Sequence, residues 1–115
     1  MTETRLTPAE AQALAEATAE AMYARDRAAH ALGIQIVRVQ PGASLLTMKV
    51  RPDMVNGHHI CHGGMIFSLA DTAFAYACNA YNKNTVASAW RNARSRSRRT
   101  FSRWPYRCLR HHRTR

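Results

Sequence analysis

The stretch HGGMIFSLADTAFAYA, residues 62–77, decides the fold that this chain of 115 residues adopts. It opens on two glycines and continues as an apolar, helix-forming segment that carries a single carboxylate, Asp71. Helix interiors disfavour aspartate, because its side chain competes for backbone hydrogen bonds. The residues one helical turn away from Asp71 are mostly apolar, so we expect a poorly solvated carboxylate that is prepared for proton transfer or nucleophilic attack. The alternative is a solvent-facing or hydrogen-bonded aspartate on an ordinary core helix.

The sequence upstream of this segment predicts a covering helix followed by two strands. Thr7, Pro8 and Glu10 form a helix start with a capping box, and we expect that helix to run to about Ala31. Strands are expected over 34–39 and 45–50, on either side of a Pro41-Gly42 turn. A loop over 51–60, the central helix over about 63–81 and the beginning of a third strand over 85–89 complete the predicted order.

The chain changes character near residue 90. Seven basic and seven acidic residues balance one another up to Ala89, whereas residues 90–115 hold ten arginines and no acidic residue. The net charge of +10 therefore belongs to this final segment. It has neither a helical nor a strand period and is expected to be disordered. We interpret the change as a reading-frame shift near codons 88–91.

Composition narrows the class of protein. No run of 18 apolar residues is present, so no membrane-spanning segment is expected. The N-terminal residues do not form a signal peptide. Cys61, Cys78 and Cys108 are odd in number and unpatterned in spacing, which indicates reduced thiols in a cytoplasm. The roughly ninety residues before the basic segment are few for a sturdy core, so we expect partner subunits to contribute.

The motifs VNGH at 55–58, CHGG at 61–64 and FSLADTAFAYACN at 67–79 resemble the hotdog-fold acyl-CoA thioesterases, in particular the phenylacetate-degradation (PaaI) type. The resemblance implies an α+β hotdog fold, in which an antiparallel sheet wraps a central helix, and which is C-terminally incomplete here. It implies a cytoplasmic homodimer or homotetramer with active sites between subunits. It implies hydrolysis of phenylacetyl-CoA or hydroxyphenylacetyl-CoA-like thioesters without a metal or organic cofactor. The expected organisation is a helical extension over 1–30, the N-terminal part of the hotdog domain over 31–89 and a basic tail over 90–115.

The resemblance also assigns site residues. Asp71 matches the catalytic carboxylate, Gly63 matches the glycine whose N–H polarises the thioester carbonyl, and Asn56 and His62 match polar residues near the scissile bond. The chemistry is consistent, because a helix start supplies free N–H groups to an oxyanion and a carboxylate can activate water or attack directly. Gly63 and Asp71 lie about 12 Å apart along a helix at ~1.5 Å per residue. We therefore expect one active site to take them from different subunits.

The remaining candidates concern substrate contacts. Gly64 lets a substrate approach the helix backbone closely, although glycine also permits tight helix packing. Met54 and Phe67 indicate an apolar acyl pocket, unless they serve ordinary core packing.

Other readings of the sequence stay open beside this one. The arginine-rich tail with its interleaved aromatic residues could bind nucleic acid, although such a run binds polyanions non-specifically. His58, His59, Cys61 and His62 have ligand-like spacing, but we expect no metal there. A cysteine nucleophile lacks a patterned histidine partner. A hotdog protein that only binds acyl-CoA and a truncated, inactive hotdog fragment are the last two alternatives.

Overall fold

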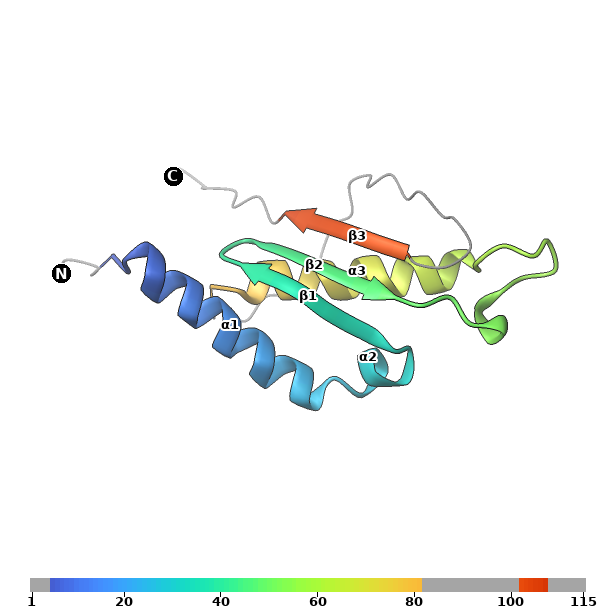
Figure 1. Ribbon diagram of the computed structural model, residues 1–115, viewed down its shortest axis with the longest axis horizontal. Coiled ribbons are helices and arrows are strands. Elements are labelled where there is room, and N and C mark those ends of the chain that lie inside the picture. The colour runs from blue at the N-terminus through green and yellow to red at the C-terminus, as the bar shows by residue number, and fades with distance from the viewer. Residues whose placement is uncertain (1–4, 82–101, 108–115) are drawn as a thin grey trace, which may run out of the picture.

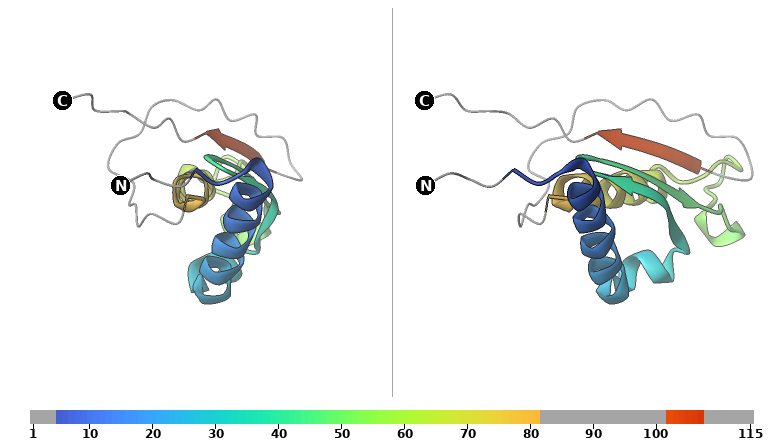
Figure 2. Two further views of the ribbon diagram at one scale, coloured as in Figure 1. Left: turned by 90° about the vertical axis from the view of Figure 1, so that its left-hand side faces the viewer. Right: turned by 60° about the vertical axis from the view of Figure 1, so that its left-hand side comes forward.

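The computed structural model describes residues 5–81 and 102–107. Three antiparallel strands form a sheet in the order β1-β2-β3, and the central helix α3 lies against β2 and β3 (Figure 1). Helix α1 runs along the β1 side of the sheet and contacts both β1 and α3 (Figure 2). The elements are α1 (Pro8–Arg25), α2 (Arg27–Ala31), β1 (Ile34–Gln40), β2 (Ala43–Met48), the 3-10 helix η1 (Pro52–Met54), α3 (Gly63–Asn79) and β3 (Ser102–Arg107).

The N-terminal helix is split at Asp26, which corrects the expectation of one helix to about Ala31. The predicted capping box is confirmed at its start, where the Thr7 side chain accepts from the Glu10 N–H and the Glu10 carboxylate accepts from the Thr7 N–H. At Asp26 the backbone leaves helical geometry with ψ 80°, and Oδ1 accepts a 3.0 Å hydrogen bond from the Ala29 N–H. Aspartate favours such capping over a helix interior, so it ends α1 and begins α2.

The two predicted strands form a hairpin. β2 covers Ala43–Met48 instead of 45–50, and the turn before it uses Gly42 at φ +74°, a conformation that favours glycine. Ser44, Leu46 and Met48 are buried on one face of β2, as the alternation of the sequence predicts for the last two. The ladder shifts register between Ile36 and Arg38, so β1 carries a bulge at Val37.

Small side chains hold α3 close to the sheet. Ala70, Ala73 and Ala77 are fully buried on the helix face that meets the strands. The hydroxyl of Ser44, itself buried on β2, donates a 2.6 Å hydrogen bond to the Ala73 carbonyl of α3. Tyr76 is buried on the same helix and donates to Asp26 Oδ2 at 3.3 Å, which ties α3 to the α1–α2 junction. Within residues 5–81, no helix is both long and apolar enough to cross a membrane.

Strand β3 departs from the expected disorder of residues 90–115. It pairs antiparallel with β2, with Trp104 opposite Leu46 and Tyr106 opposite Ser44. Aromatic residues favour strands, and the second edge of β2 offers unpaired backbone groups to them. Pro105, which lacks an N–H, is tolerated because no further strand of the described part of the chain pairs with β3. The expected strand at 85–89 and the rest of the tail lie outside the described residues.

The Ser44 hydrogen bond predicts a measurable stability effect. The substitution Ser44→Ala removes the tie between β2 and α3 without creating a large cavity, so the free energy of unfolding should fall by about 1 kcal/mol. Urea unfolding followed by circular dichroism measures the change. Ser68→Ala is the matched control, because its hydroxyl only bonds the Gly64 carbonyl of its own helix. Equal effects of the two substitutions would contradict the role assigned to Ser44.

The Tyr76–Asp26 contact predicts a pH dependence at the alkaline end. Burial, followed by the Asp26 carboxylate, raises the pKa of Tyr76 above its ordinary value of 10.0. The folded state therefore favours the neutral hydroxyl, and this contribution to stability is full below about pH 10 and is lost as the pH rises toward the higher folded pKa. The free energy of unfolding should decline less steeply above pH 10 in Tyr76→Phe than in the parent chain. Parallel curves for the two proteins would show that Tyr76 does not titrate in this way.

Candidate active site

His62 starts the central helix and orients its first peptide groups. As the N-cap residue it accepts a 3.0 Å hydrogen bond from the Gly64 N–H through Nδ1. Its carbonyl accepts from the Met65 and Ile66 N–H groups, and its own N–H donates to the Met54 carbonyl at 2.7 Å. The neutral imidazole that accepts at Nδ1 carries its proton on Nε2. The geometry therefore makes His62 a positioning residue for the helix start.

The two glycines at the helix start differ in what their backbone offers. The Gly64 N–H is occupied by His62, whereas the Gly63 N–H has no acceptor among the described residues. A Cβ at Gly63 would meet no atom of the described residues within 4 Å, whereas one at Gly64 would meet His62 Nδ1 at 3.3 Å. Tight packing within the part of the chain that the structure describes therefore does not account for glycine at position 63. The Gly63 N–H is an open donor at the positive end of a helix of 17 residues.

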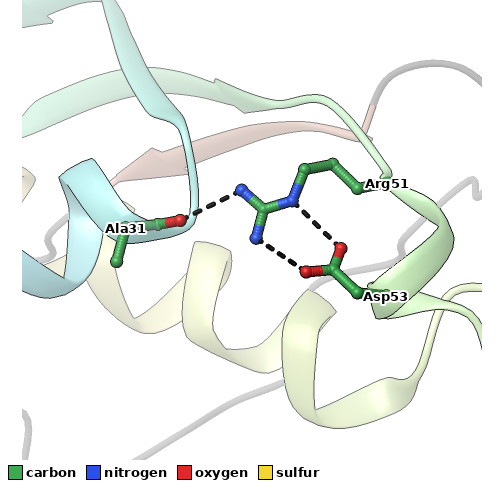
Figure 3. Close-up of polar contacts among 3 residues, drawn as sticks. All are labelled: Ala31, Arg51 and Asp53. Atoms are coloured by element: carbon green, nitrogen blue, oxygen red, sulfur yellow. Dashed lines mark hydrogen bonds and ion pairs between the residues drawn. The ribbon is translucent and has the colours of Figure 1, made fainter.

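An arginine clamp fixes the loop that leads to the helix. Arg51 Nε and one terminal nitrogen donate to the two carboxylate oxygens of Asp53 at 3.0 and 3.3 Å, and the other terminal nitrogen donates to the Ala31 carbonyl at 3.0 Å (Figure 3). The clamp joins the start of η1 to the C-terminus of α2. The Arg51 hydrogen bonds lower the pKa of the Asp53 carboxyl, so the pair stays ionised. Both side chains are well solvated, which makes the clamp an orienting contact more than a source of stability.

Asn56 organises the tip of the same loop. Its Oδ1 accepts from the His58 N–H at 2.9 Å and from the Ile60 N–H at 3.4 Å, and its own N–H donates to the Ile60 carbonyl. Because both N–H groups need an acceptor, the amide is oriented with its oxygen inward and Nδ2 outward. Nδ2 makes no hydrogen bond with the described residues. Asn56 thus combines a structural acceptor with a donor that remains available.

Asp71 lies on the exposed face of α3 together with Phe67. The face opposite to the sheet contains Gly64, Phe67 and Asp71 at helical spacing, and all three are exposed, Phe67 by 52%. The poorly solvated environment that the sequence predicts for Asp71 is therefore not supplied by the described part of this chain. Asp71 does have apolar neighbours on α3, but the sheet covers the opposite face of the helix and leaves Asp71 in contact with solvent.

Met54 does not line a surface site. Its side chain is 2% exposed and belongs to the hydrophobic core, so ordinary packing explains it and the expected contact with substrate is not available.

Burial raises the pKa of the neighbouring Cys61 thiol, which disfavours a thiolate nucleophile. Within the described ranges, no three side chains of the His, Cys, Asp and Glu types converge as a metal site would require.

The described chain brings together one half of the site that the sequence predicts. Gly63, His62 and Asn56 are linked through the loop and the helix start, whereas Asp71 lies about 12 Å farther along α3 at ~1.5 Å per residue. The arrangement offers hydrogen-bond donors to a developing oxyanion at one place and a carboxylate at another. One carbonyl group cannot contact both within a single chain.

Arg51 and Asp53 contribute to the site without having been expected. The sequence carries a signal for them, because an arginine and an aspartate flank Pro52 directly after the expected strand over 45–50. Nothing in that spacing indicates that Arg51 also reaches the Ala31 carbonyl, a contact between residues far apart in the sequence.

Comparisons with known proteins agree with this geometry. The acyl-coenzyme A thioesterase PaaI of Escherichia coli is 56% identical over 71 residues, which are 62% of this chain and 51% of that protein. The solved structure of the E. coli PaaI protein from the phenylacetic acid degradation operon matches with a TM-score of 0.67 and 52% identity, over 68% of this chain and 56% of that chain. No family model matches.

A more distant structure supports the fold alone. A thioesterase family protein from Silicibacter pomeroyi matches with a TM-score of 0.55 and 24% identity, over 57% of this chain and 48% of that chain. The chain spans about half the length of the curated relatives that it matches. The α+β arrangement of a central helix against an antiparallel sheet is the one that these structures share. The described body of the chain therefore has the hotdog arrangement of a central helix against an antiparallel sheet, and it is similar to the E. coli PaaI thioesterase.

Proposed function

We propose that this chain belongs to an acyl-CoA thioesterase that hydrolyses phenylacetyl-CoA or hydroxyphenylacetyl-CoA-like thioesters. The observation that carries the proposal is the Gly63 N–H, which is open at the start of α3 with empty space where a side chain would lie. A carbonyl oxygen can approach such a donor closely, and one donor of this kind stabilises a transition state by ~3 kcal/mol. The similarity to the E. coli thioesterase supports the same reaction class.

The proposed reaction assigns each site residue a role. The Gly63 N–H and Asn56 Nδ2 donate hydrogen bonds to the carbonyl oxygen as it becomes an oxyanion. Asp71 removes a proton from water, whose oxygen then bonds to the carbonyl carbon. The tetrahedral intermediate collapses, the carbon–sulfur bond breaks and the CoA thiolate takes up a proton. In the alternative route Asp71 itself attacks the carbon, and water hydrolyses the resulting mixed anhydride.

The separation of Gly63 and Asp71 favours a site shared by two copies of the chain. A helix start from one subunit and a carboxylate from the other would face the same carbonyl, and the exposed stripe with Phe67 and Asp71 would then be covered. Such burial would supply the apolar environment that the single chain lacks around Asp71. A homodimer or homotetramer in the cytoplasm is accordingly part of the proposal, and so is the absence of a resident metal or organic cofactor.

The partial coverage of the relatives favours one alternative. The chain matches about half of the E. coli protein, and residues 90–115 carry arginines where we expect further strands. An inactive hotdog fragment, produced by a reading-frame shift near codons 88–91, has the described fold without the complete site. Sequencing the coding DNA through codon 90 and translating the other two frames distinguishes a lesion from a genuine tail.

The substitution Asp71→Asn tests the carboxylate. Hydrolysis of phenylacetyl-CoA by the full chain, followed by chromatography of released phenylacetate, should fall roughly 100- to 10,000-fold. Binding of an analogue with an amide in place of the thioester should persist, because the substitution preserves shape. Glu20→Gln, on exposed α1, is the matched carboxylate control and should hydrolyse normally. Normal hydrolysis by Asp71→Asn would refute the mechanism, and an inactive parent chain would favour the fragment.

The substitution Gly63→Ala tests the oxyanion donor. A methyl group at Gly63 has no atom of the described residues within 4 Å to clash with, so the thermal midpoint should not change. The same methyl group stands where the substrate carbonyl approaches, and kcat/KM should fall roughly 100-fold. Full activity with unchanged stability would show that the carbonyl binds elsewhere.

A further inference from the structure

The loop between η1 and α3 closes as a small hairpin. Val55 pairs with Cys61 in an isolated antiparallel bridge. One residue farther toward the tip, the Asn56 N–H donates a 2.9 Å hydrogen bond to the Ile60 carbonyl. The tip itself turns through His59, whose φ of +61° lies in the left-handed region that residues other than glycine rarely adopt. Bonds on both strands of the hairpin therefore hold its side chains in one register.

Ile60 lies opposite Asn56 in this hairpin. Besides the bond between their backbones, the Ile60 N–H donates to Asn56 Oδ1 at 3.4 Å, so the Asn56 amide lies against the Ile60 backbone. Residues opposite one another on two antiparallel strands share one face, with Cβ atoms about 5 Å apart. The open donor Nδ2 belongs to the same amide group. A group that accepts from Asn56 Nδ2 is therefore within reach of the Ile60 side chain.

The Ile60 side chain is exposed, although isoleucine is among the residue types most often buried. It is 57% exposed, and Val55 before it and Phe67 after it are 37% and 52% exposed. Three of the five exposed large apolar residues in the described part of the chain thus fall between residues 55 and 67. The same segment holds the two open donors, Asn56 Nδ2 and the Gly63 N–H. Apolar groups beside a few hydrogen-bond donors are typical of a small-molecule site.

We propose that Ile60 is a specificity-determining residue, which contacts the acyl group of the thioester and favours large apolar acyl groups over small ones. The inference rests on the proposed function, because it places the substrate carbonyl at Asn56 Nδ2. A carbonyl oxygen held there brings the acyl group against Ile60, and the apolar surfaces of both leave water together. A phenylacetyl ring has the apolar area to cover the Ile60 side chain, whereas an acetyl group is too short to cover much of it.

Binding of two non-hydrolysable analogues to the full chain tests this contact. The analogues are phenylacetyl-CoA and acetyl-CoA with an amide in place of the thioester, and isothermal titration calorimetry measures both dissociation constants. Ile60→Ser removes most of the apolar surface, whereas Ile60→Val removes one methylene group. Val37→Ser is the matched control, because Val37 is also β-branched and 51% exposed but lies on β1. Circular dichroism confirms that all variants fold alike.

Ile60→Ser should weaken binding of the phenylacetyl analogue roughly tenfold and leave the acetyl analogue within about twofold, because only the larger group loses an apolar contact. Ile60→Val should fall between Ile60→Ser and the parent, and Val37→Ser should match the parent for both analogues. Equal weakening of both analogues would overturn the proposal, since Ile60 would then contact the CoA part or a second subunit. Unchanged affinities in Ile60→Ser, or a parent chain that binds neither analogue, would overturn it as well.

This test is separable from that of the proposed function, because binding and hydrolysis are measured independently. A parent chain that hydrolyses no thioester, but whose preference for the phenylacetyl analogue is lost in Ile60→Ser, would support the contact and contradict the proposed hydrolysis. A chain that hydrolyses phenylacetyl-CoA, but with the same ratio of kcat/KM over acetyl-CoA in the parent and in Ile60→Ser, would support the hydrolysis and overturn the contact.

Discussion

The close contact between α3 and β2 is the constraint on which the rest of the structure depends. Alanines at positions 70, 73 and 77 let the helix backbone approach the sheet, and the Ser44 hydroxyl bonds directly to the Ala73 carbonyl. Larger side chains on this face would lift the helix away and break that bond. With the axis of α3 fixed against the sheet, its start and its exposed face are both fixed in space. The loop, the glycines and Asp71 take their places from this contact.

Around the helix start, several weak contacts act together to present one peptide group. Arg51 anchors the beginning of the loop to α2, Asn56 folds its tip, and His62 caps the Gly64 N–H. Each of these contacts is exposed and contributes little to stability by itself. Their common effect is geometric, because they orient the helix start and leave the Gly63 N–H without an acceptor among the described residues. Three polar residues, Arg51, Asn56 and His62, thus fix the position of the Gly63 peptide group.

Sequence reasoning anticipated the features that local chemistry determines. The capping box at Thr7 and Glu10, the Pro41-Gly42 turn and the glycine-opened helix all follow from residues within a few positions of one another. The prediction of one continuous helix to about Ala31 missed the break at Asp26. The sequence alone does not show that the Asp26 side chain accepts a hydrogen bond from the Ala29 N–H and so begins a new helix. The sequence offered Met54 either to a substrate pocket or to the core. Its burial could not be predicted, because it depends on elements far away in the chain.

The features that remained beyond sequence reasoning are those that depend on distant partners. Arg51 reaches Ala31, Tyr76 reaches Asp26 and β3 pairs with β2, all across long separations in the sequence. Of the two alternatives for Asp71, the described residues show the solvent-facing one, because helical spacing predicts neighbours on the same helix but not what covers them. The proposed site between two copies of the chain would cover this exposed carboxylate and the half-exposed Phe67.

The most direct test of this account is the amide spectrum of the helix start. The full chain, labelled with nitrogen-15, is titrated with the phenylacetyl-CoA analogue that has an amide in place of the thioester, and the Gly63 and Gly64 resonances are followed. The account predicts that the Gly63 amide proton moves downfield and saturates, while the Gly64 amide, held by His62, stays near its original position. A Gly63 resonance that does not move, or a shift confined to Gly64, would contradict it.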